Sequence, residues 1–262
     1  MTIRTTPWPA GVPCWADLST PDVTAAKGFY SAVIGWEFQD TEDEYGGYAI
    51  ATSGGHPAAG VGPAQADAPV AWTMYFASDD ADKAAAAVAE AGGTVIVAPG
   101  DVGPLGRMFI AADPTGAAFG VWQAGTHIGA GITNEPGGLA WEDLRTTDPD
   151  AARAFYEAVF GFTFQALDGA GEDYTMFHLP GDDAPLGGMG GMMGAEGAPP
   201  HWLTYFSVAS TDAALAAAEG AGGTVVAPAF DTPYGRMAGI TDPAGAMFWV
   251  VENTTDQPQP ER

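Results

Sequence analysis

The sequence predicts an α+β protein made of two tandem domains that share one fold. Residues 13–40 align with residues 139–166 at an offset of 126, and fourteen of these 28 positions are identical. Two further pairs of segments align later in the chain, and the first of these pairs starts at Trp72 and Trp202. A repeat of about 130 residues is too long for one unit of a solenoid, so each copy is a domain. We expect domains at 10–123 and 138–253, a linker at 124–137 and a frayed polar tail at 254–262.

Each copy begins with a strand and an amphipathic helix. In the first copy the strand covers Cys14 to Leu18, the helix begins near Asp22, and Gly35 ends it in the position after the last helical residue. The second copy repeats this pattern with a strand at 140–144 and a helix that ends at Gly161. The four-residue spacing in the first helix predicts a buried stripe made of Ala25, Phe29 and Val33.

The remaining elements follow in the same order in both copies. Short strands around 48–50 and 174–179 come first, and then a second strand and an alanine-rich helix begin at Trp72 or Trp202. Paired glycines end these helices, at 92–93 and 222–223. The Asp-Pro-x-Gly sequences that begin at Asp113 and Asp242 are typical of type I turns, so they join the last two strands of each copy as a hairpin. Each domain is therefore expected to contain two β-α-β-β-β modules.

Composition excludes several classes of protein. With 47% hydrophobic and 16% charged residues the chain is globular, and no apolar stretch approaches the roughly 20 residues that a membrane span needs. The N-terminal segment lacks the apolar core of a signal peptide, so we expect a cytoplasmic protein. Eight basic and 33 acidic residues give a net charge of −25, and so few bases cannot form the basic face that nucleic acid requires. Since Cys14 is the only cysteine, an intrachain disulfide is excluded.

The motifs resemble those of a known superfamily. FYSAVIGWEF and FYEAVFGFTF occur early in the two copies, and DPTGAAFGVW and DPAGAMFWVV occur late. This layout resembles the vicinal oxygen chelate superfamily, which includes glyoxalases, bleomycin-resistance proteins and extradiol dioxygenases, and it looks most like the actinobacterial tandem type. The resemblance implies glyoxalase-like domains in which a mixed sheet curls into a cup around a ligand cavity with the helices outside. It also implies a pseudo-dimer within one chain, which could be a monomer or a homodimer.

The resemblance further implies positions for metal ligands, and these positions can be counted. Metal-dependent members carry His or Glu fifteen residues before the Tyr of the Phe-Tyr pair and seven residues after the Asp of Asp-Pro-x-Gly. Here those positions and the matching strand of the second module hold Trp15, Gly120, Trp141 and Trp249, with Thr73 and Leu203. None of these side chains is a usual ligand for a transition metal, so we predict no metal cofactor.

Four histidines remain as possible metal ligands. His201 should point into the second cavity and His178 should lie on a neighbouring strand, but no carboxylate falls in register with them, which favours hydrogen-bonded roles. His56 and His127 fall in glycine-rich loops and are expected at the surface.

Strand alternation predicts which residues face each cavity. The predicted ligand-binding residues are Trp15, Asp17, Tyr75 and Trp122 in the first domain, and Trp141, Asp143, His201, Tyr205 and Trp249 in the second. The opposite face, with Phe119 and Phe248, should belong to the core. Aromatic walls with one carboxylate and one phenol per cavity suit a flat or extended apolar ligand with a polar or cationic group.

Several interpretations of these residues stay open. The tryptophans either stack on a ligand or fill the space that metal ligands occupy elsewhere. Asp17 and Asp143 either form salt bridges with Arg107 and Arg236 or act in acid–base chemistry. The methionine-rich segment at 185–200 is either a plain glycine-rich connection or a pliable lid. The first copy has no matching segment, so the second cavity is the expected binding site.

The leading hypothesis is a metal-independent binding protein of the resistance or sequestration type, with an aromatic metabolite or drug as its small-molecule partner. The alternative is an enzyme. It would be a lyase or isomerase that uses Asp143 and Tyr205 without a metal, or a metal enzyme such as an oxygenase that recruits His201. A third possibility is that both cavities are filled and the protein acts through its surface.

Overall fold

The structure, a computed structural model, describes residues 2–41, 45–65, 68–167, 169–170, 173–194 and 197–253. The expected tail at 254–262 lies outside the described residues. Among the described residues, no helix is both long and apolar enough to span a membrane.

The first domain has the two expected modules. The first module contains β2 (Pro13–Thr20), α1 (Val23–Val33), β3 (Glu37–Asp40), β4 (Ala49–Ser53) and β5 (His56–Pro63). The second module contains β6 (Ala71–Ala77), α2 (Ala81–Glu90), β7 (Thr94–Val102), β8 (Gly106–Ala112) and β9 (Ala118–Ala124). Together the strands form one mixed sheet in the order β3-β4-β5-β2-β6-β9-β8-β7.

The second domain repeats this arrangement. Its first module contains β11 (Leu139–Arg145), α3 (Pro149–Phe160), β12 (Thr163–Ala166), β13 (Thr175–His178) and β14 (Pro185–Gly190). Its second module contains β15 (His201–Ser207), α4 (Thr211–Gly220), β16 (Thr224–Thr232), β17 (Gly235–Thr241) and β18 (Met247–Asn253). The strand order β12-β13-β14-β11-β15-β18-β17-β16 matches that of the first sheet, so the α+β class and the tandem repeat are confirmed.

Local sequence signals set the helix ends as expected. Asp22 caps α1, because its carboxylate accepts a hydrogen bond from the backbone N–H of Ala25 at 2.9 Å. Gly161 ends α3 in the left-handed conformation, with φ 74°. The predicted stripe of α1 was wrong at one position, because Ala25 is exposed and Ala26 is buried in its place. The buried face therefore follows the spacing i, i+3, i+4 and i+7 from Ala26 and includes Tyr30.

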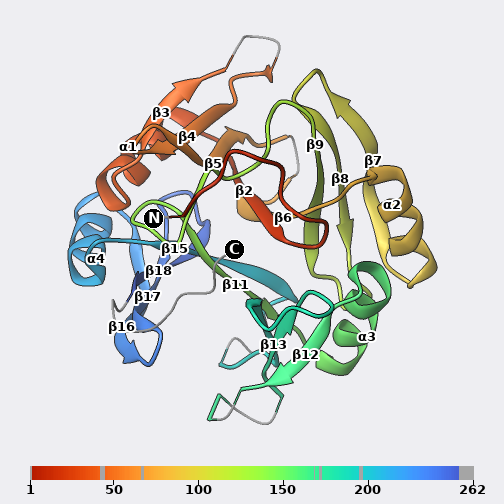
Figure 1. Ribbon diagram of the computed structural model, residues 1–262. Helices are drawn as coiled ribbons and strands as arrows, with labels where there is room; N and C mark the ends of the chain where they lie inside the picture. The colour runs from red at the N-terminus through yellow and green to blue at the C-terminus, as the bar shows by residue number, and fades with distance from the viewer. Residues whose placement is uncertain are drawn as a thin grey trace.

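The hydrophobic core lies between the two sheets. Phe119 and Phe248 are fully buried there, as predicted. Figure 1 shows α1 beside α4 and α2 beside α3, so each helix lies next to a helix of the other domain, in agreement with the contacts between these elements. The two domains thus share one core and form a pseudo-dimer within the chain.

Two equivalent hydrogen bonds cross this core. The hydroxyl of Tyr30 on α1 donates to Asp242 in the second domain at 3.1 Å, and the hydroxyl of Tyr156 on α3 donates to Asp113 in the first at 3.2 Å. Each tyrosine oxygen also accepts an indole N–H from its own domain. The Phe-Tyr motif of one copy is therefore bonded to the Asp-Pro-x-Gly turn of the other.

The segment expected as a linker is part of the second sheet. It contains β10 (Ile132–Thr133), which pairs with β1 (Thr2–Ile3) on one side and with β11 on the other. The N–H of Ala130 donates to the carbonyl of Cys14 at 2.7 Å, which ties the same segment to the first domain. The connection between the domains is consequently packed against both of them.

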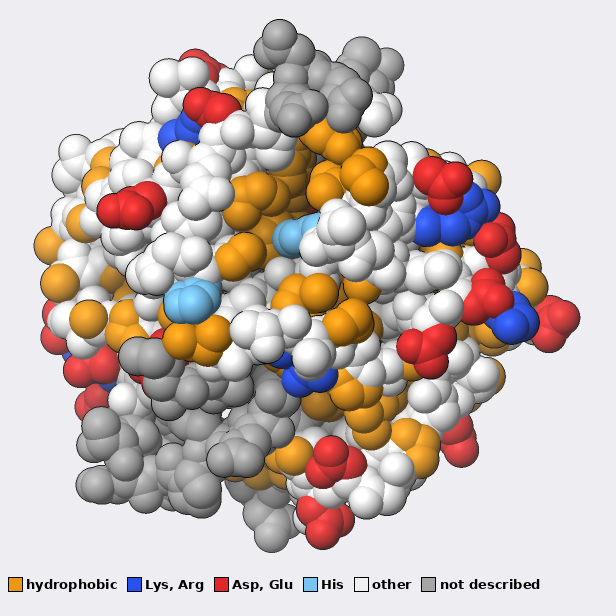
Figure 2. Space-filling view, turned by 45° about the horizontal axis from the view of Figure 1, so that its top comes forward, with side chains coloured by type: hydrophobic (Ala, Val, Ile, Leu, Met, Phe, Trp, Pro, Cys, Tyr) orange, Lys and Arg blue, Asp and Glu red, His pale blue; other side chains and the backbone are white. Residues whose placement is uncertain are grey.

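The surface reflects the unusual composition. Figure 2 shows apolar side chains gathered in a hollow near the middle of one face, while the acidic side chains lie mostly toward its periphery. Arg107 and Arg236 each bridge two exposed aspartates, Asp82 and Asp101 for the first and Asp212 and Asp231 for the second. The open interpretation that they pair with Asp17 and Asp143 was therefore wrong, because both arginines lie on strands at the far side of their sheets from β2 and β11.

Candidate functional site

The face of each sheet that points away from the shared core carries the predicted ligand-binding residues. We call this face the first cup in the first domain and the second cup in the second domain. Register confirms the placement: Trp15 on β2 pairs with Tyr75 on β6, and Trp141 on β11 pairs with Tyr205 on β15. The structure thus groups the predicted residues by domain, on the face that strand alternation indicated.

Asp17 is the centre of the first cup. Its carboxylate accepts hydrogen bonds from the hydroxyls of Tyr75 at 3.1 Å and Tyr48 at 3.5 Å. The indole N–H of Trp15 donates in turn to the hydroxyl of Tyr48 at 3.0 Å. No salt bridge to Asp17 occurs among the described residues.

Burial without a cation changes the acidity of this group. Desolvation raises the pKa of the Asp17 carboxyl to about 7, and the hydrogen bonds from Tyr75 and Tyr48 oppose this shift only in part. Burial and the nearby Asp17 charge also raise the pKa of both tyrosines well above the usual value, so they remain hydrogen-bond donors. The first cup therefore holds a carboxyl group that can take up a proton near neutral pH.

The linker closes the first cup. The ring of His127 meets the ring of Trp15 edge to face, with centroids 4.6 Å apart, and the backbone carbonyl of His127 accepts the indole N–H of Trp122 at 2.9 Å. The expectation that His127 is a surface residue was wrong, because the linker folds back over the aromatic cup. Burial lowers the pKa of His127 to about 4, so the ring is neutral at physiological pH.

Asp143 has a different set of partners in the second cup. Its Oδ1 accepts from the hydroxyl of Tyr174 at 2.6 Å and from the indole of Trp141 at 3.0 Å. Its Oδ2 accepts from the hydroxyl of Tyr205 at 2.9 Å and from Nη2 of Arg145 at 2.8 Å. Burial acts to lower the pKa of Arg145, but Asp143, Tyr205 and Tyr174 together outweigh it, so the pKa is raised.

Three of these residues were not predicted from the sequence. Tyr48 and Tyr174 stand 126 positions apart, which is the offset of the repeat, so their recurrence was a usable signal. Arg145 lies two residues after Asp143 on β11 and shares its face, but the first copy has Ser19 at the matching position. Arg145 occurs in only one copy, so a search for residues common to both copies could not find it.

The second cup exposes more apolar surface than the first. Trp141 and Trp249 are half-buried there, whereas Trp15 and Trp122 are buried in the first cup. The ring of Trp249 packs on that of Tyr205 with centroids 5.4 Å apart. In the first domain the matching residue is Gly120, and a Cβ there would lie 2.1 Å from the ring of Tyr75. Tyr75 thus fills space that a tryptophan occupies in the other domain.

Two buried polar atoms of the second cup have no hydrogen-bond partner among the described residues. Nε2 of His201 and Nε1 of Trp249 are buried and have no hydrogen-bond partner within the described part of the chain. Both side chains belong to the predicted set, and His201 pairs in register with Arg145. In the first cup, by contrast, the indoles of Trp15 and Trp122 both donate hydrogen bonds.

His178 lies on a neighbouring strand, as expected. It is buried on β13, and neither ring nitrogen has a hydrogen-bond partner among the residues that are described. The methionine-rich segment also begins differently from the expected loop, since its first six residues form β14 and Met189 is fully buried in the core.

The donor set does not fit the divalent metal that the resemblance implies. Each cup offers one carboxylate at its centre, and Oδ2 of Asp17 and both oxygens of Asp143 already accept the hydrogen bonds given above. Within the described ranges no three His, Cys, Asp or Glu side chains come close enough together to hold a metal ion. A transition-metal site needs three or four converging donors.

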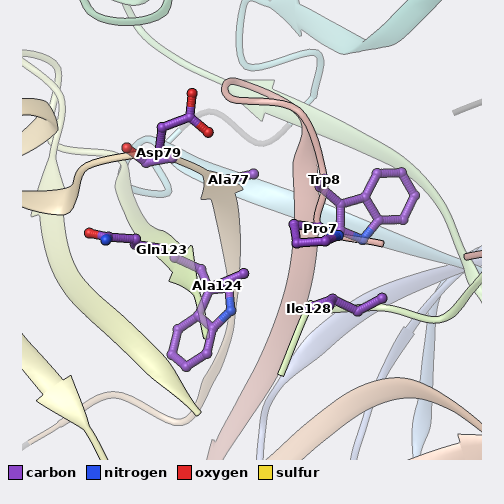
Figure 3. A pocket seen from close by; sticks show the side chains of 9 residues that line it. Pro7, Trp8, Ala77, Asp79, Gln123, Ala124 and Ile128 are labelled. Carbon is purple, nitrogen blue, oxygen red and sulfur yellow. The ribbon is translucent and has the colours of Figure 1, made fainter. Parts of the chain in front are cut away.

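A cavity of about 240 Å³ opens beside the first cup. Figure 3 shows Pro7, Trp8 and Ile128 on one side of it, and Asp79, Gln123 and Ala124 on the other. Of the predicted ligand-binding residues, only Trp122 lines this cavity.

Comparison with protein families gives one match that covers both copies. The model described as the Glyoxalase/Bleomycin resistance protein/Dioxygenase superfamily matches residues 14–121 and 134–250. The putative glyoxylase CFP32 of Mycobacterium tuberculosis is 43% identical over 256 residues, which cover 94% of this chain and 97% of that protein. The anthracycline biosynthesis protein DnrV of Streptomyces peucetius is 40% identical over 259 residues, which cover 92% of this chain and 93% of that protein.

Solved structures share the fold at low sequence identity. The Mn(II)-bound glyoxalase from Novosphingobium aromaticivorans has a TM-score of 0.65 at 18% identity, with 95% of this chain and 86% of that chain covered. A catechol 2,3-dioxygenase has a TM-score of 0.64 at 12% identity, with 96% and 92% covered.

Proposed function

Since the chain belongs to the glyoxalase, bleomycin-resistance and dioxygenase superfamily, we propose that it binds a small aromatic molecule in its second cup without a metal ion. The observation that carries this proposal is the unpaired hydrogen-bonding capacity of His201 and Trp249. Buried polar atoms in folded proteins nearly always have partners, so two unpaired atoms on one apolar surface favour a ligand that supplies them.

The polarity of these atoms defines the class of ligand. Nδ1 of His201 lies 2.8 Å from the carbonyl oxygen of Pro199, which can only accept, so Nδ1 carries the hydrogen and Nε2 is the acceptor of this tautomer. Trp249 offers an N–H donor. A ligand with both a hydroxyl and a carbonyl group complements this pair, and the half-buried rings of Trp141 and Trp249 provide surfaces for stacking.

The names of the relatives support an aromatic ligand. One relative at 40% identity is an anthracycline biosynthesis protein, and an anthracycline contains a flat, hydroxylated quinone system. We therefore extend the proposal to polycyclic aromatic molecules with hydroxyl and carbonyl groups. Binding such a molecule would serve sequestration or delivery.

Acid–base catalysis by Asp143 and Tyr205 receives less support. Four donors occupy Asp143, which matches the roughly four acceptor positions of a carboxylate. A general base needs a free position that faces the substrate. Since Asp143 has none, the geometry favours a residue that orients Arg145 and Tyr205.

Titration of metal-free protein with a hydroxyanthraquinone, followed by tryptophan fluorescence and thermal shift, tests the proposal. Bound ligand should raise the melting temperature by mass action. Trp249→Phe removes the unpaired N–H donor and should weaken binding by about tenfold, because one buried hydrogen bond is lost.

The matched control is Trp122→Phe, which removes an indole N–H from the first cup and should leave the affinity unchanged. A larger loss with Trp122→Phe than with Trp249→Phe would contradict the choice of cup. Binding or turnover that appears only after a divalent metal is added would overturn metal independence.

A further inference from the structure

Arg145 is a cation held inside the aromatic second cup. Its side chain is 11% exposed, and its Nη2 binds Asp143 at 2.8 Å. The guanidinium also lies over the ring of Tyr174, with Cζ 5.8 Å from the centroid. These two contacts fix the plane of the guanidinium, so they also fix the position of its other terminal nitrogen, Nη1.

Nη1 faces a weak acceptor. Its partner is the thioether sulfur of Met193, which is a poor hydrogen-bond acceptor for a guanidinium. Met193 is 58% exposed, so few contacts hold its side chain in place. Its φ of 47° lies in the left-handed region that non-glycine residues seldom adopt, and among the described non-glycine residues only Asn134 shares this feature. An oxygen atom could therefore replace the sulfur with a gain in hydrogen-bond strength.

The charges around Arg145 favour a neutral oxygen over an anionic one as its partner. Asp143 already neutralises Arg145, and the whole chain carries a net charge of −25, so an anionic ligand would be repelled. A neutral carbonyl oxygen accepts a hydrogen bond from Nη1 without adding charge.

We propose that Arg145 determines ligand specificity by binding a neutral carbonyl oxygen of the aromatic ligand in the place of the Met193 thioether. This inference rests on the proposed function of the second cup. It also assigns recognition to one domain, because Ser19 stands at the matching position of the first copy and is too short to take the same role.

A matched pair of probes tests this assignment. Hydroxymethylanthraquinone and hydroxymethylanthracene share one ring skeleton and one solubilising group, but only the quinone has ring carbonyls. The wild-type chain should bind the quinone about tenfold more tightly, as expected for one hydrogen bond from a charged donor. Met193→Ala should increase this preference, because it removes the competing sulfur.

Removal of Arg145 alone would leave Asp143 buried and unpaired, so the test uses the double variant Asp143→Asn with Arg145→Met. This variant should bind both probes with the affinity that the wild type shows for the anthracene. Arg236→Met, which removes an arginine paired with two surface aspartates, is the control and should keep the quinone preference.

The outcomes separate the two proposals. Equal binding of both probes to the wild type, or a quinone preference that survives in the double variant, would overturn the role of Arg145 and leave binding in the second cup intact. If neither probe binds, the proposed function fails as well. An anthraquinone carboxylate that binds more tightly than the neutral quinone would show that charge, and not the carbonyl, is recognised.

Discussion

At the scale of single residues, the two cups show how one substitution decides whether a buried carboxyl group has a cation beside it. Asp17 and Asp143 are each bonded to two tyrosines. Only Asp143 has a guanidinium beside it, because position 145 is arginine while the matching Ser19 carries no charge. Asp143 is therefore paired with a cation, whereas burial raises the pKa of Asp17 to about 7.

Asp17→Asn should make the stability of the protein less dependent on pH. An aspartate has a pKa of about 3.9 in an unfolded chain, so the folded state binds this proton more tightly. The contribution of Asp17 is fully present below about pH 4 and is lost as the pH rises through about 7. The asparagine variant, which has no charge to bury, should melt at a higher temperature than the wild type at pH 8. Thermal melts at pH 6.5 and pH 8 measure the difference.

The pKa of His127 is shifted in the opposite direction from that of Asp17, and this shift determines the pH range in which the melts are measured. Its pKa is lowered to about 4, so its contribution is present above about pH 6.5 and is lost as the pH falls toward 4. Below pH 6.5 the two residues offset each other. Glu90→Gln, at an exposed position on α2, is the control and should leave the melting temperature at pH 8 unchanged. A wild-type preference for pH 6.5 over pH 8 that persists undiminished in Asp17→Asn would contradict the assignment.

Strand alternation was enough to predict which residues share each cup, because side chains two apart on a strand must face the same way. It could not predict that His127 folds over Trp15, since that contact depends on the path of the linker. Nor could it predict that Asp143 pairs with Arg145 and not with Arg236, because this choice depends on how far apart the strands lie in the sheet.

At the scale of secondary structure elements, helices and hairpins were predictable because their signals are local. Aspartates at the N-caps, glycines after the last turn and the Asp-Pro-x-Gly turns all lie where expected. The role of the turns in the interface was not predictable. Asp113 binds its own turn through Oδ1 and reaches Tyr156 of the other domain through Oδ2.

Tyr156→Phe should destabilise the protein by about 1–3 kcal/mol, because it leaves two buried partners without a hydrogen bond. The lost hydroxyl donates to Asp113 and accepts the indole N–H of Trp202 at 2.9 Å. Denaturant unfolding measures the change. Tyr234→Phe, at an exposed tyrosine on the β16–β17 turn, should have no effect. Equal stability of Tyr156→Phe and the wild type would show that the hydrogen bonds across the core contribute little.

At the scale of the whole molecule, the two copies share one hydrophobic core. The family match divides the chain into two segments, but the aromatic core and both Tyr–Asp bonds lie between them. A large apolar face of each sheet would meet water if the other domain were absent, and such a face is a strong drive for association.

Either domain expressed alone should therefore aggregate or pair with a second copy of itself, whereas the two domains expressed together as separate chains should form a stable heterodimer. Size-exclusion chromatography with light scattering distinguishes these species. A folded, monomeric single domain would show that the shared core is not required.

The pairing of β1 with β10 has a consequence for the order in which the chain is completed. Thr2 and Ile3 leave the ribosome well before their partners Thr133 and Ile132, which lie far later in the chain. The N-terminal arm must wait for these partners and then becomes an edge of the second sheet. A deletion of Thr2 and Ile3 would thus disturb the second domain, although these residues precede the first domain in the sequence.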